Sequence, residues 1–390
     1  MPLTHTDWYV MEGMPVTVPA QFAGFEFVGY PIKDPSNWAL MGYPAGKAVV
    51  VPPASLNIGM VRVGGDGLSS WDAIEPTQGA YNWTGLDAAV TVHRAAGRRV
   101  FYTPNVGVAG YSFYSYGTLG DATAYTGWLA RWYNFINALV YRYNDPAGAW
   151  RVANPTLGKG LFAIDGWNEM FEGFFTGTNA QRIDVHYRMY QAAKAADAAI
   201  EVWSPSANNF QAIGPTFFNT AGSNYPGITG KDCANALSVH WYNYSLPSQT
   251  YGDWTNACLT GFGAIQRLRT VLLNAGKPAT FPIYVSEAGF DYREPGGSAA
   301  LTAFNATSSD TRRIHWTRLM MWGAASGFQG WSTYAWERQY TGFPMDDLAG
   351  VPKAVSDINN NVSGRTITSA RYKPSGVVAL TFSDGSTYTV

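Results

Sequence analysis

The chain has 390 residues, of which 46% are hydrophobic and only 14% are charged, and its formal net charge is −1. This composition supplies a sizeable core and excludes a largely disordered chain. The near-neutral charge argues against nucleic acid and anionic membranes as partners, and no apolar run reaches the roughly 20 residues of a membrane span.

Short apolar runs alternate with amphipathic stretches, which is the pattern of a parallel sheet with crossover helices. Eight runs are predicted to be strands: residues 25–30, 58–64, 100–104, 160–165, 199–205, 237–242, 282–286 and 327–334. Helices are predicted over residues 86–96, 125–143, 182–198, 263–274, 310–325 and 347–358. We therefore predict an α/β fold, a (β/α)8 TIM barrel, rather than an open sheet of the dinucleotide-binding kind, whose glycine fingerprint is absent.

The two ends of the chain are predicted to lie outside the barrel, which we assign to residues 21–362. Residues 366–372 and 377–382 alternate like strands, and a hairpin turn follows at Ser383-Asp384-Gly385-Ser386. Residues 363–390 are therefore predicted to form a small β appendage. The N-terminal segment, residues 1–20, can pair with it.

Aromatic residues are abundant, with 15 Trp, 24 Tyr and 20 Phe. They can simply fill a large core. Alternatively, flat rings stack on the apolar faces of sugars while the polar tips of Tyr and Trp bond hydroxyl groups. Residues 106–116, an aromatic stretch after the third predicted strand, fall where a loop would wall a substrate cleft.

Two cysteines, Cys233 and Cys258, flank the segment around His240. A disulfide between them would close a loop of about 25 residues and stabilise the fold by roughly 3 kcal/mol. Two unrelated buried thiols are the alternative, and the spacing indicates no metal site. Residues 1–7 lack the basic region and apolar run of a secretory signal.

Two glutamates each close a predicted buried strand, Glu169 the fourth and Glu287 the seventh. In a (β/α)8 barrel the C-terminal ends of the strands converge, and two converging carboxylates can cleave a glycosidic bond. We predict that Glu169 is the acid/base and Glu287 the nucleophile. A separation of about 5 Å would indicate retention, and roughly 6.5–9.5 Å would indicate inversion. Glu172, in the loop beyond the fourth strand, is the alternative to Glu169.

Asn168 and Arg62 are predicted to support this pair. Asn168 can bond the sugar 2-hydroxyl, but neighbouring strand residues face opposite ways, so Asn168 and Glu169 both reach the site only if the pleat loosens. Arg62 is a charge inside an apolar strand, where a charge is rarely buried without a partner. It could keep Glu287 ionised, or it could form a purely structural ion pair.

His240 and Tyr242 share one face of the sixth strand, and either could steady the nucleophile or bind substrate. A core histidine is the alternative for His240. Trp336, just past the eighth strand, is a candidate sugar platform or an ordinary core residue. The sequence has no Gly-x-Ser-x-Gly elbow, zinc-type histidine pair or phosphate loop, so we expect neither a metal nor a cofactor.

The order of these residues resembles clan A of the glycoside hydrolases, over roughly residues 20–350. The resemblance rests on Arg62, Trp167-Asn168-Glu169, His240-x-Tyr242, Glu287 and Trp336, and on Trp71–Pro76 followed by Gly79–Trp83. It is strongest to glycoside hydrolase family 39 and its neighbours, with family 5 as an alternative. It implies retaining hydrolysis by Glu169 and Glu287, with Trp167 and the other matched residues at the substrate. Met170 departs from the proline common in family 39, and the usual β-sandwich accessory is reduced to a short tail.

The function predicted from the sequence is therefore retaining hydrolysis of a polysaccharide or oligosaccharide. Endo action is expected from the aromatic loops, and a secreted or surface location is also expected. One alternative is an exo-acting β-glycosidase with a pocket. Another is a non-catalytic carbohydrate-binding barrel, in which one of the two carboxylates would be misplaced.

Overall fold

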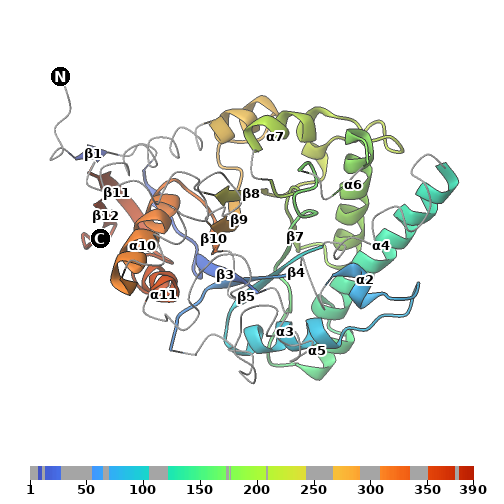
Figure 1. The fold of residues 1–390 in the computed structure, drawn as a ribbon, viewed down its shortest axis with the longest axis horizontal. Coiled ribbons are helices and arrows are strands. Elements are labelled where there is room, and N and C mark those ends of the chain that lie inside the picture. Colours follow the sequence, from blue (N-terminus) through green and yellow to red (C-terminus); the bar gives the residue numbers. More distant parts are fainter. Residues whose placement is uncertain are drawn as a thin grey trace.

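The computed structural model describes residues 8–10, 14–27, 55–64, 70–104, 122–172, 175, 177–207, 210–242, 267–289, 308–333, 350–373 and 377–390. Within them the strands form two sheets, one of eight parallel strands and one of five antiparallel strands. Figure 1 shows the parallel sheet at the centre of the molecule with helices around it, and the smaller sheet beside α10 (Ser309–Ala325).

The parallel sheet is the barrel. Its strands are β3 (Ala23–Phe27), β4 (Met60–Gly64), β5 (Arg99–Thr103), β6 (Ala163–Ile164), β7 (Glu201–Val202), β8 (Leu237–Tyr242), β9 (Ile283–Gly289) and β10 (Gly330–Thr333). Neighbours along the chain pair in parallel, and β10 pairs with β3. Between β7 and β8 the ring closes through a single bridge from Trp203 to Ala236. The predicted (β/α)8 fold is confirmed, since each observed strand overlaps a predicted one.

Helices surround the barrel near their predicted positions. They are α2 (Trp71–Ile74), α3 (Thr84–Ala95), α4 (Ala122–Asn144), α5 (Ala149–Ala153), α6 (Asn179–Ala196), α7 (Phe210–Asn219), the 3-10 helix η4 (Gly230–Asp232), α10 and α11 (Val351–Asn361), and residues 267–274 are also helical. Two of them begin at hydroxyl caps: Thr178 forms a capping box with Gln181, and the Ser308 side chain accepts from the Thr311 N–H. Among the described residues no helix combines the length and apolarity that crossing a bilayer requires.

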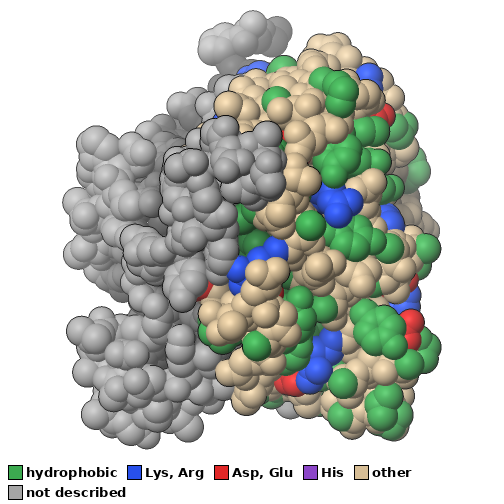
Figure 2. All heavy atoms as spheres, turned by 90° about the vertical axis from the view of Figure 1, so that its right-hand side faces the viewer, with side chains coloured by type: hydrophobic (Ala, Val, Ile, Leu, Met, Phe, Trp, Pro, Cys, Tyr) green, Lys and Arg blue, Asp and Glu red, His purple; other side chains and the backbone are tan. Residues whose placement is uncertain are grey.

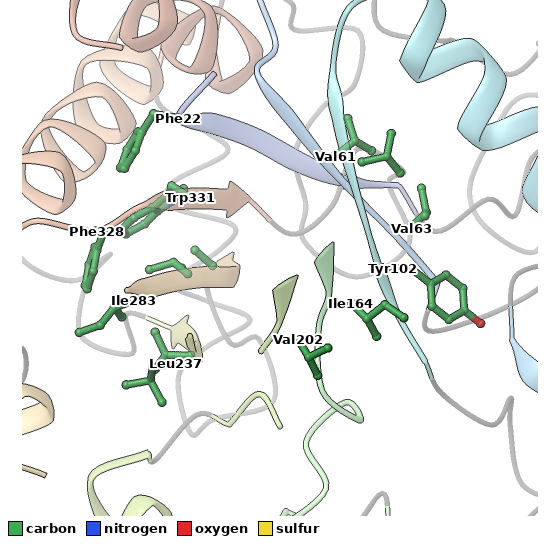
Figure 3. Close-up of a cluster of buried hydrophobic side chains, with 14 of the residues drawn as sticks. Phe22, Val61, Val63, Tyr102, Ile164, Val202, Leu237, Ile283, Phe328 and Trp331 are labelled. Carbon is green, nitrogen blue, oxygen red and sulfur yellow. The ribbon is translucent and has the colours of Figure 1, made fainter. Parts of the chain in front are cut away.

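The core has two parts, separated by the wall of the barrel. Outward-facing strand residues such as Val61, Ile164 and Val202 belong to the larger cluster between the strands and the helices (Figure 3). Inward-facing residues fill the lower barrel, where the rings of Trp203 and Tyr284 stack with centroids 4.0 Å apart. The interior is therefore a packed core, as is usual for this fold, and polar side chains can gather only above this layer.

The outer surface is mixed. On the face shown in Figure 2, charged side chains of both signs are interspersed with apolar ones among the coloured residues. Exposed large apolar side chains, such as Tyr141 on α4 and Val152 on α5, occur singly in the sequence, which is ordinary for a folded domain.

The smaller sheet joins both ends of the chain. Its central strand β11 (Thr366–Tyr372) pairs with β12 (Val378–Phe382), and β12 pairs with β13 (Thr387–Thr389). The N-terminal strands β1 (Tyr9–Val10) and β2 (Val16–Thr17) both pair with β11. The sheet is anchored to the barrel helices, since Nε of Arg318 on α10 donates to the carbonyl oxygen of Val390 at 2.9 Å.

Cys233 is a buried free thiol rather than half of a disulfide. Its Sγ lies 3.5 Å from the carbonyl oxygen of Thr229, and burial raises the pKa of the thiol. The disulfide with Cys258 that the spacing allowed is therefore not formed, and Cys258 itself lies outside the described residues. Cys233 is therefore an ordinary buried core residue, with its thiol close to the backbone carbonyl groups of Thr229 and Gly230.

Three buried histidines predict that the fold loses stability in acid. Burial lowers the pKa values of His93, His186 and His315 to about 3, whereas an unfolded chain has histidine pKa values near 6.5. The neutral rings contribute their full stability above about pH 6.5, and this is lost as the pH falls toward 3. Each contributes a slope of up to about 1.4 kcal/mol per pH unit in the free energy of unfolding.

Urea denaturation at pH 7, 6 and 5 measures this slope. The variant His186→Gln should show a shallower slope, because it removes one group whose pKa differs between the folded and unfolded states. A free energy of unfolding that stays constant from pH 7 to 5 in the unmodified protein would contradict the prediction.

Candidate active site

Glu169 and Glu287 meet at the C-terminal mouth of the barrel. Glu287 lies near the end of β9, and Glu169 follows β6 by five residues. One carboxylate oxygen of each and one ring nitrogen of His240 all lie within 4.8 Å of one another. Each glutamate is only 7% exposed. The structure therefore brings together the two carboxylates that the sequence analysis paired across 118 positions.

A β-bulge turns Glu287 toward the barrel interior. Val239 on β8 pairs with Val285, but the next residue, His240, pairs with Glu287, so the register slips at Ser286. The Ser286 hydroxyl is hydrogen-bonded to Ser238 at 2.7 Å, while the adjacent Glu287 contacts other inward-facing side chains. Bulges commonly re-aim a side chain beside an active site, and here two consecutive residues face inward.

Glu169 occupies an unusual backbone conformation. Its φ of 43° lies in the left-handed region, which is uncommon for a residue other than glycine and costs of order 1 kcal/mol or more. The chain leading to it presses against the continuation of β7, because a Cβ at Gly166 would lie 2.3 Å from the backbone nitrogen of Pro205. The sequence analysis required strict strand alternation to break down at this strand end. In the structure it does so through a tight turn at Glu169.

Arg62 binds residues from four other segments around the barrel mouth. Its Nη1 donates to Glu26 at 2.8 Å and to Glu287 at 2.5 Å, its Nη2 to Asn168 at 2.5 Å, and its Nε to Thr103 at 2.8 Å. Burial alone would lower the pKa of the guanidinium, but the charges of Glu26, Glu287 and Asp165 raise it, so Arg62 is a permanent cation. It fixes the orientation of the Glu287 carboxylate and of the Asn168 amide together.

His240 stands between the two glutamates. Its Nδ1 lies 2.8 Å from Oε1 of Glu169, and its Nε2 faces Oε2 of Glu287 at the longer distance of 3.4 Å. Burial lowers the pKa of His240 to about 4, an effect that the Glu287 charge opposes and the Arg62 charge reinforces. The ring is therefore neutral at neutral pH and has one N–H donor and one lone pair.

The remaining predicted residues are placed as follows. Asn168 contacts Arg62, whereas Trp167 lies in the core and packs on Trp132 with ring centroids 5.5 Å apart. Tyr242 ends β8, but its side chain is outside the described residues, as are Trp336 and the 106–116 stretch. Glu172, the alternative acid, is only half-buried in the turn after Glu169. The roles assigned to these residues stay predictions.

Three buried residues of the site were missed in the sequence analysis: Glu26, Thr103 and Asp165. Glu26 bonds Arg62, and Thr103 connects Arg62 to Asp165. Glu26 interrupts an apolar strand between Phe25 and Phe27, which is the same signal that singled out Arg62. Asp165 directly follows a buried strand and could have been found in the same way. Nothing in the sequence marks Thr103.

The motif after the second barrel strand has a structural explanation. Glu75, which is buried, accepts hydrogen bonds from the Trp71 indole at 2.5 Å, the Gly79 N–H at 2.7 Å and Arg131 at 3.2 Å. These contacts tie α2 to the following turn and to α4. Trp71 and Glu75 thus hold this segment together.

Glu169, His240 and Glu287 are also spaced so that they could ligate a metal ion. A divalent ion there would lie beside the buried guanidinium of Arg62, which is 2.5 Å from Glu287. Repulsion between two cations at short range in a buried site opposes such binding. The donor set therefore suits proton transfer better than metal ligation.

The fold and site define a (β/α)8 barrel with a buried glutamate pair at its mouth. No protein-family model matches the sequence, and a comparison with curated proteins finds no match. Among solved structures, a family 51 α-L-arabinofuranosidase from Bifidobacterium longum is similar with a TM-score of 0.61 at 12% identity, over 96% of this chain and 83% of that one. A glucosidase from Croceicoccus marinus has a TM-score of 0.57 at 13% identity, over 96% and 77%.

Endo-glycoceramidase II from Rhodococcus sp. is a third similar structure, with a TM-score of 0.52 at 16% identity, over 95% of this chain and 86% of that one. Identities this low establish a shared fold and nothing finer, because one fold hosts many activities. The chain therefore has the (β/α)8 architecture of these glycosidases, and its function must be argued from its own site.

Proposed function

We propose that the protein is a retaining glycoside hydrolase that cleaves a polysaccharide or oligosaccharide by double displacement. The observation that carries the proposal is the buried pair of Glu169 and Glu287, with oxygens within 4.8 Å of each other at the mouth of the barrel. Retaining enzymes place their carboxyl groups about 5–5.5 Å apart, whereas inverting enzymes leave room for a water. The fold shared with three glycosidases supports the same conclusion.

The neutral ring of His240 gives the two glutamates different proton states. An N–H on Nε2, 3.4 Å from Glu287, interacts favourably with an ionised Glu287, and this tautomer leaves the Nδ1 lone pair to accept a hydrogen bond from a protonated Glu169 at 2.8 Å. The opposite tautomer would aim a lone pair at the Glu287 carboxylate. Glu287 is then the ionised nucleophile and Glu169 the protonated acid, which is the division of roles that the chemistry needs.

In this mechanism Glu287 attacks the anomeric carbon and forms a covalent glycosyl ester while Glu169 protonates the departing oxygen. Glu169 then removes a proton from the water that hydrolyses the ester. Asn168 contributes through its orientation: because its Oδ1 accepts from Arg62, its Nδ2 is left to donate to the sugar. A bond to the 2-hydroxyl would strengthen as the ring flattens in the transition state.

Endo action, a secreted or surface location and membership of family 39 rest on the sequence analysis alone. Digestion of a panel of polysaccharides decides between endo and exo action, because long early products require an open cleft and monosaccharides alone indicate a pocket.

The stereochemistry of the first product tests the mechanism. Proton NMR during hydrolysis should show that the anomeric configuration of the newly formed sugar equals that of the substrate. An inverted product would contradict double displacement. Binding of oligosaccharides without cleavage of any substrate on the panel would favour the non-catalytic carbohydrate-binding barrel instead.

A further inference from the structure

A third buried carboxylate, that of Asp165, approaches Arg62 at its Nε, whereas Glu26 and Glu287 both contact Nη1. Asp165 directly follows β6 and is 0% exposed. Its Oδ2 accepts a hydrogen bond from the Thr103 hydroxyl at 3.0 Å and lies 4.0 Å from Nε of Arg62. The same hydroxyl accepts from Nε at 2.8 Å. A continuous chain of hydrogen bonds therefore runs from the guanidinium through Thr103 to Asp165.

Within the described ranges of the chain, the charges around Arg62 do not balance if every carboxyl is ionised. One guanidinium faces three buried carboxyl groups, Glu26 from β3, Glu287 from β9 and Asp165. Asp165 is the least exposed of the three, and its Oδ1 accepts no hydrogen bond from the part of the chain that the structure describes. A buried carboxylate oxygen without a donor is costly, so Asp165 is the member whose charge is least well supported.

The surroundings of Asp165 set where it ionises. Arg62 on β4, Thr103 on β5 and Ser238 on β8 face it, together with the Gly166 backbone N–H. Burial raises the pKa of Asp165 to about 6, although the Arg62 charge and these neighbouring polar groups oppose the rise. Asp165 therefore changes charge within the range of pH in which an enzyme works.

We propose that Asp165 is a positioning residue for the reaction, which competes through Thr103 with Glu287 for the charge of Arg62. This inference rests on the proposed function. When Asp165 is neutral, the guanidinium charge is shared by Glu26 and Glu287. When Asp165 is ionised, the same charge is shared by three carboxylates, so Glu287 is less neutralised and is a stronger nucleophile.

The variant Asp165→Asn tests the proposal, because it removes the charge and keeps the shape. Titration of the Glu287 carboxyl carbon by ¹³C NMR, assigned with Glu287→Gln, needs no substrate. In the unmodified protein this resonance should show an additional step near pH 6. The value of kcat/KM should rise over the same pH range by at least about threefold. This is the factor in an equilibrium constant that half a pKa unit represents. Both steps should disappear in Asp165→Asn.

Two variants at Thr103 distinguish the loss of the hydrogen-bonded connection between Arg62 and Asp165 from a loss of folding. Thr103→Ser keeps the hydroxyl and should keep the step, whereas Thr103→Val removes the hydroxyl and should reduce it. If Asp165→Asn fails to fold, the two Thr103 variants are sufficient to test the proposal. Steps near pH 6 of equal size in Thr103→Ser and Thr103→Val would overturn it. An activity of Asp165→Asn that is lowered equally at every pH, with both steps retained, would show a merely structural role.

The NMR titration and the hydrolysis assay also distinguish a failure of this proposal from a failure of the proposed function. Loss of the NMR step in Asp165→Asn, together with no hydrolysis of any glycoside by the unmodified protein, would leave the coupling between the carboxyls established and remove only the glycosidase assignment. Hydrolysis with retention, but no NMR step in the unmodified protein, would do the reverse.

Discussion

Replacement of Glu287 by Gln is expected to reduce turnover of any substrate by at least about 10⁴-fold, because an amide cannot form the glycosyl ester. The amide can still occupy the space of the carboxylate beside Arg62, so the fold should persist. Single-turnover assays with an activated aryl glycoside measure the loss, since the first chemical step is then observed directly. No covalent intermediate should accumulate in this variant.

Replacement of Glu169 by Gln should give a loss that depends on the leaving group. General acid catalysis contributes about 10²–10⁴-fold, but a good aryl leaving group needs no proton. Cleavage of such a substrate should therefore show a burst followed by slow hydrolysis of the intermediate, whereas natural linkages should hardly be cleaved. Added azide should replace the water in the second step and give a glycosyl azide of retained configuration.

Glu172→Gln is the matched control for both variants. Glu172 lies three residues from Glu169 and was the alternative acid, but it is half-buried in the turn and more exposed than the glutamate pair. Its replacement should leave turnover within about tenfold of the unmodified protein, a range that tolerates an indirect electrostatic effect on His240. Assignment of the acid to Glu169 is wrong if Glu172→Gln loses the leaving-group dependence and Glu169→Gln does not.

Replacement of Arg62 by Met is expected to lower the free energy of unfolding at pH 7 by about 3–5 kcal/mol, since it leaves buried carboxylates without their cation. Glu26, Glu287 and Asp165 would then repel one another inside the barrel. The loss should shrink toward pH 4, because protonated carboxyl groups carry no charge. Urea denaturation across this pH range measures both effects.

Lys159→Met provides the comparison for Arg62→Met. The Lys159 side chain is 50% exposed and pairs with Asp197 at 2.7 Å. An exposed pair of this kind contributes about 0–1 kcal/mol, so its removal should change the stability little. Similar losses in the free energy of unfolding of the two variants would contradict the prediction. They would show that the carboxylates at the barrel mouth do not depend on Arg62 for their stability.

The strands were predictable because each is a short apolar run, and the barrel buries one side of every strand against helices. Arg62 and Glu287 could also be found from the sequence, because a charged residue in or beside a short apolar run is buried and needs a partner. The geometry that brings the site together was not predictable from periodicity. Strict alternation does not yield the bulge at Ser286 or the left-handed turn at Glu169, because both arise from tertiary contacts.

The turn at Glu169 bears on the choice between an enzyme and a non-catalytic barrel. A glycine would adopt the observed φ of 43° without steric conflict and would relieve the backbone. A glycine at this position would therefore cost the backbone less. Under the proposed function the strain at Glu169 has a purpose, because the acid/base role requires a carboxyl group at this turn.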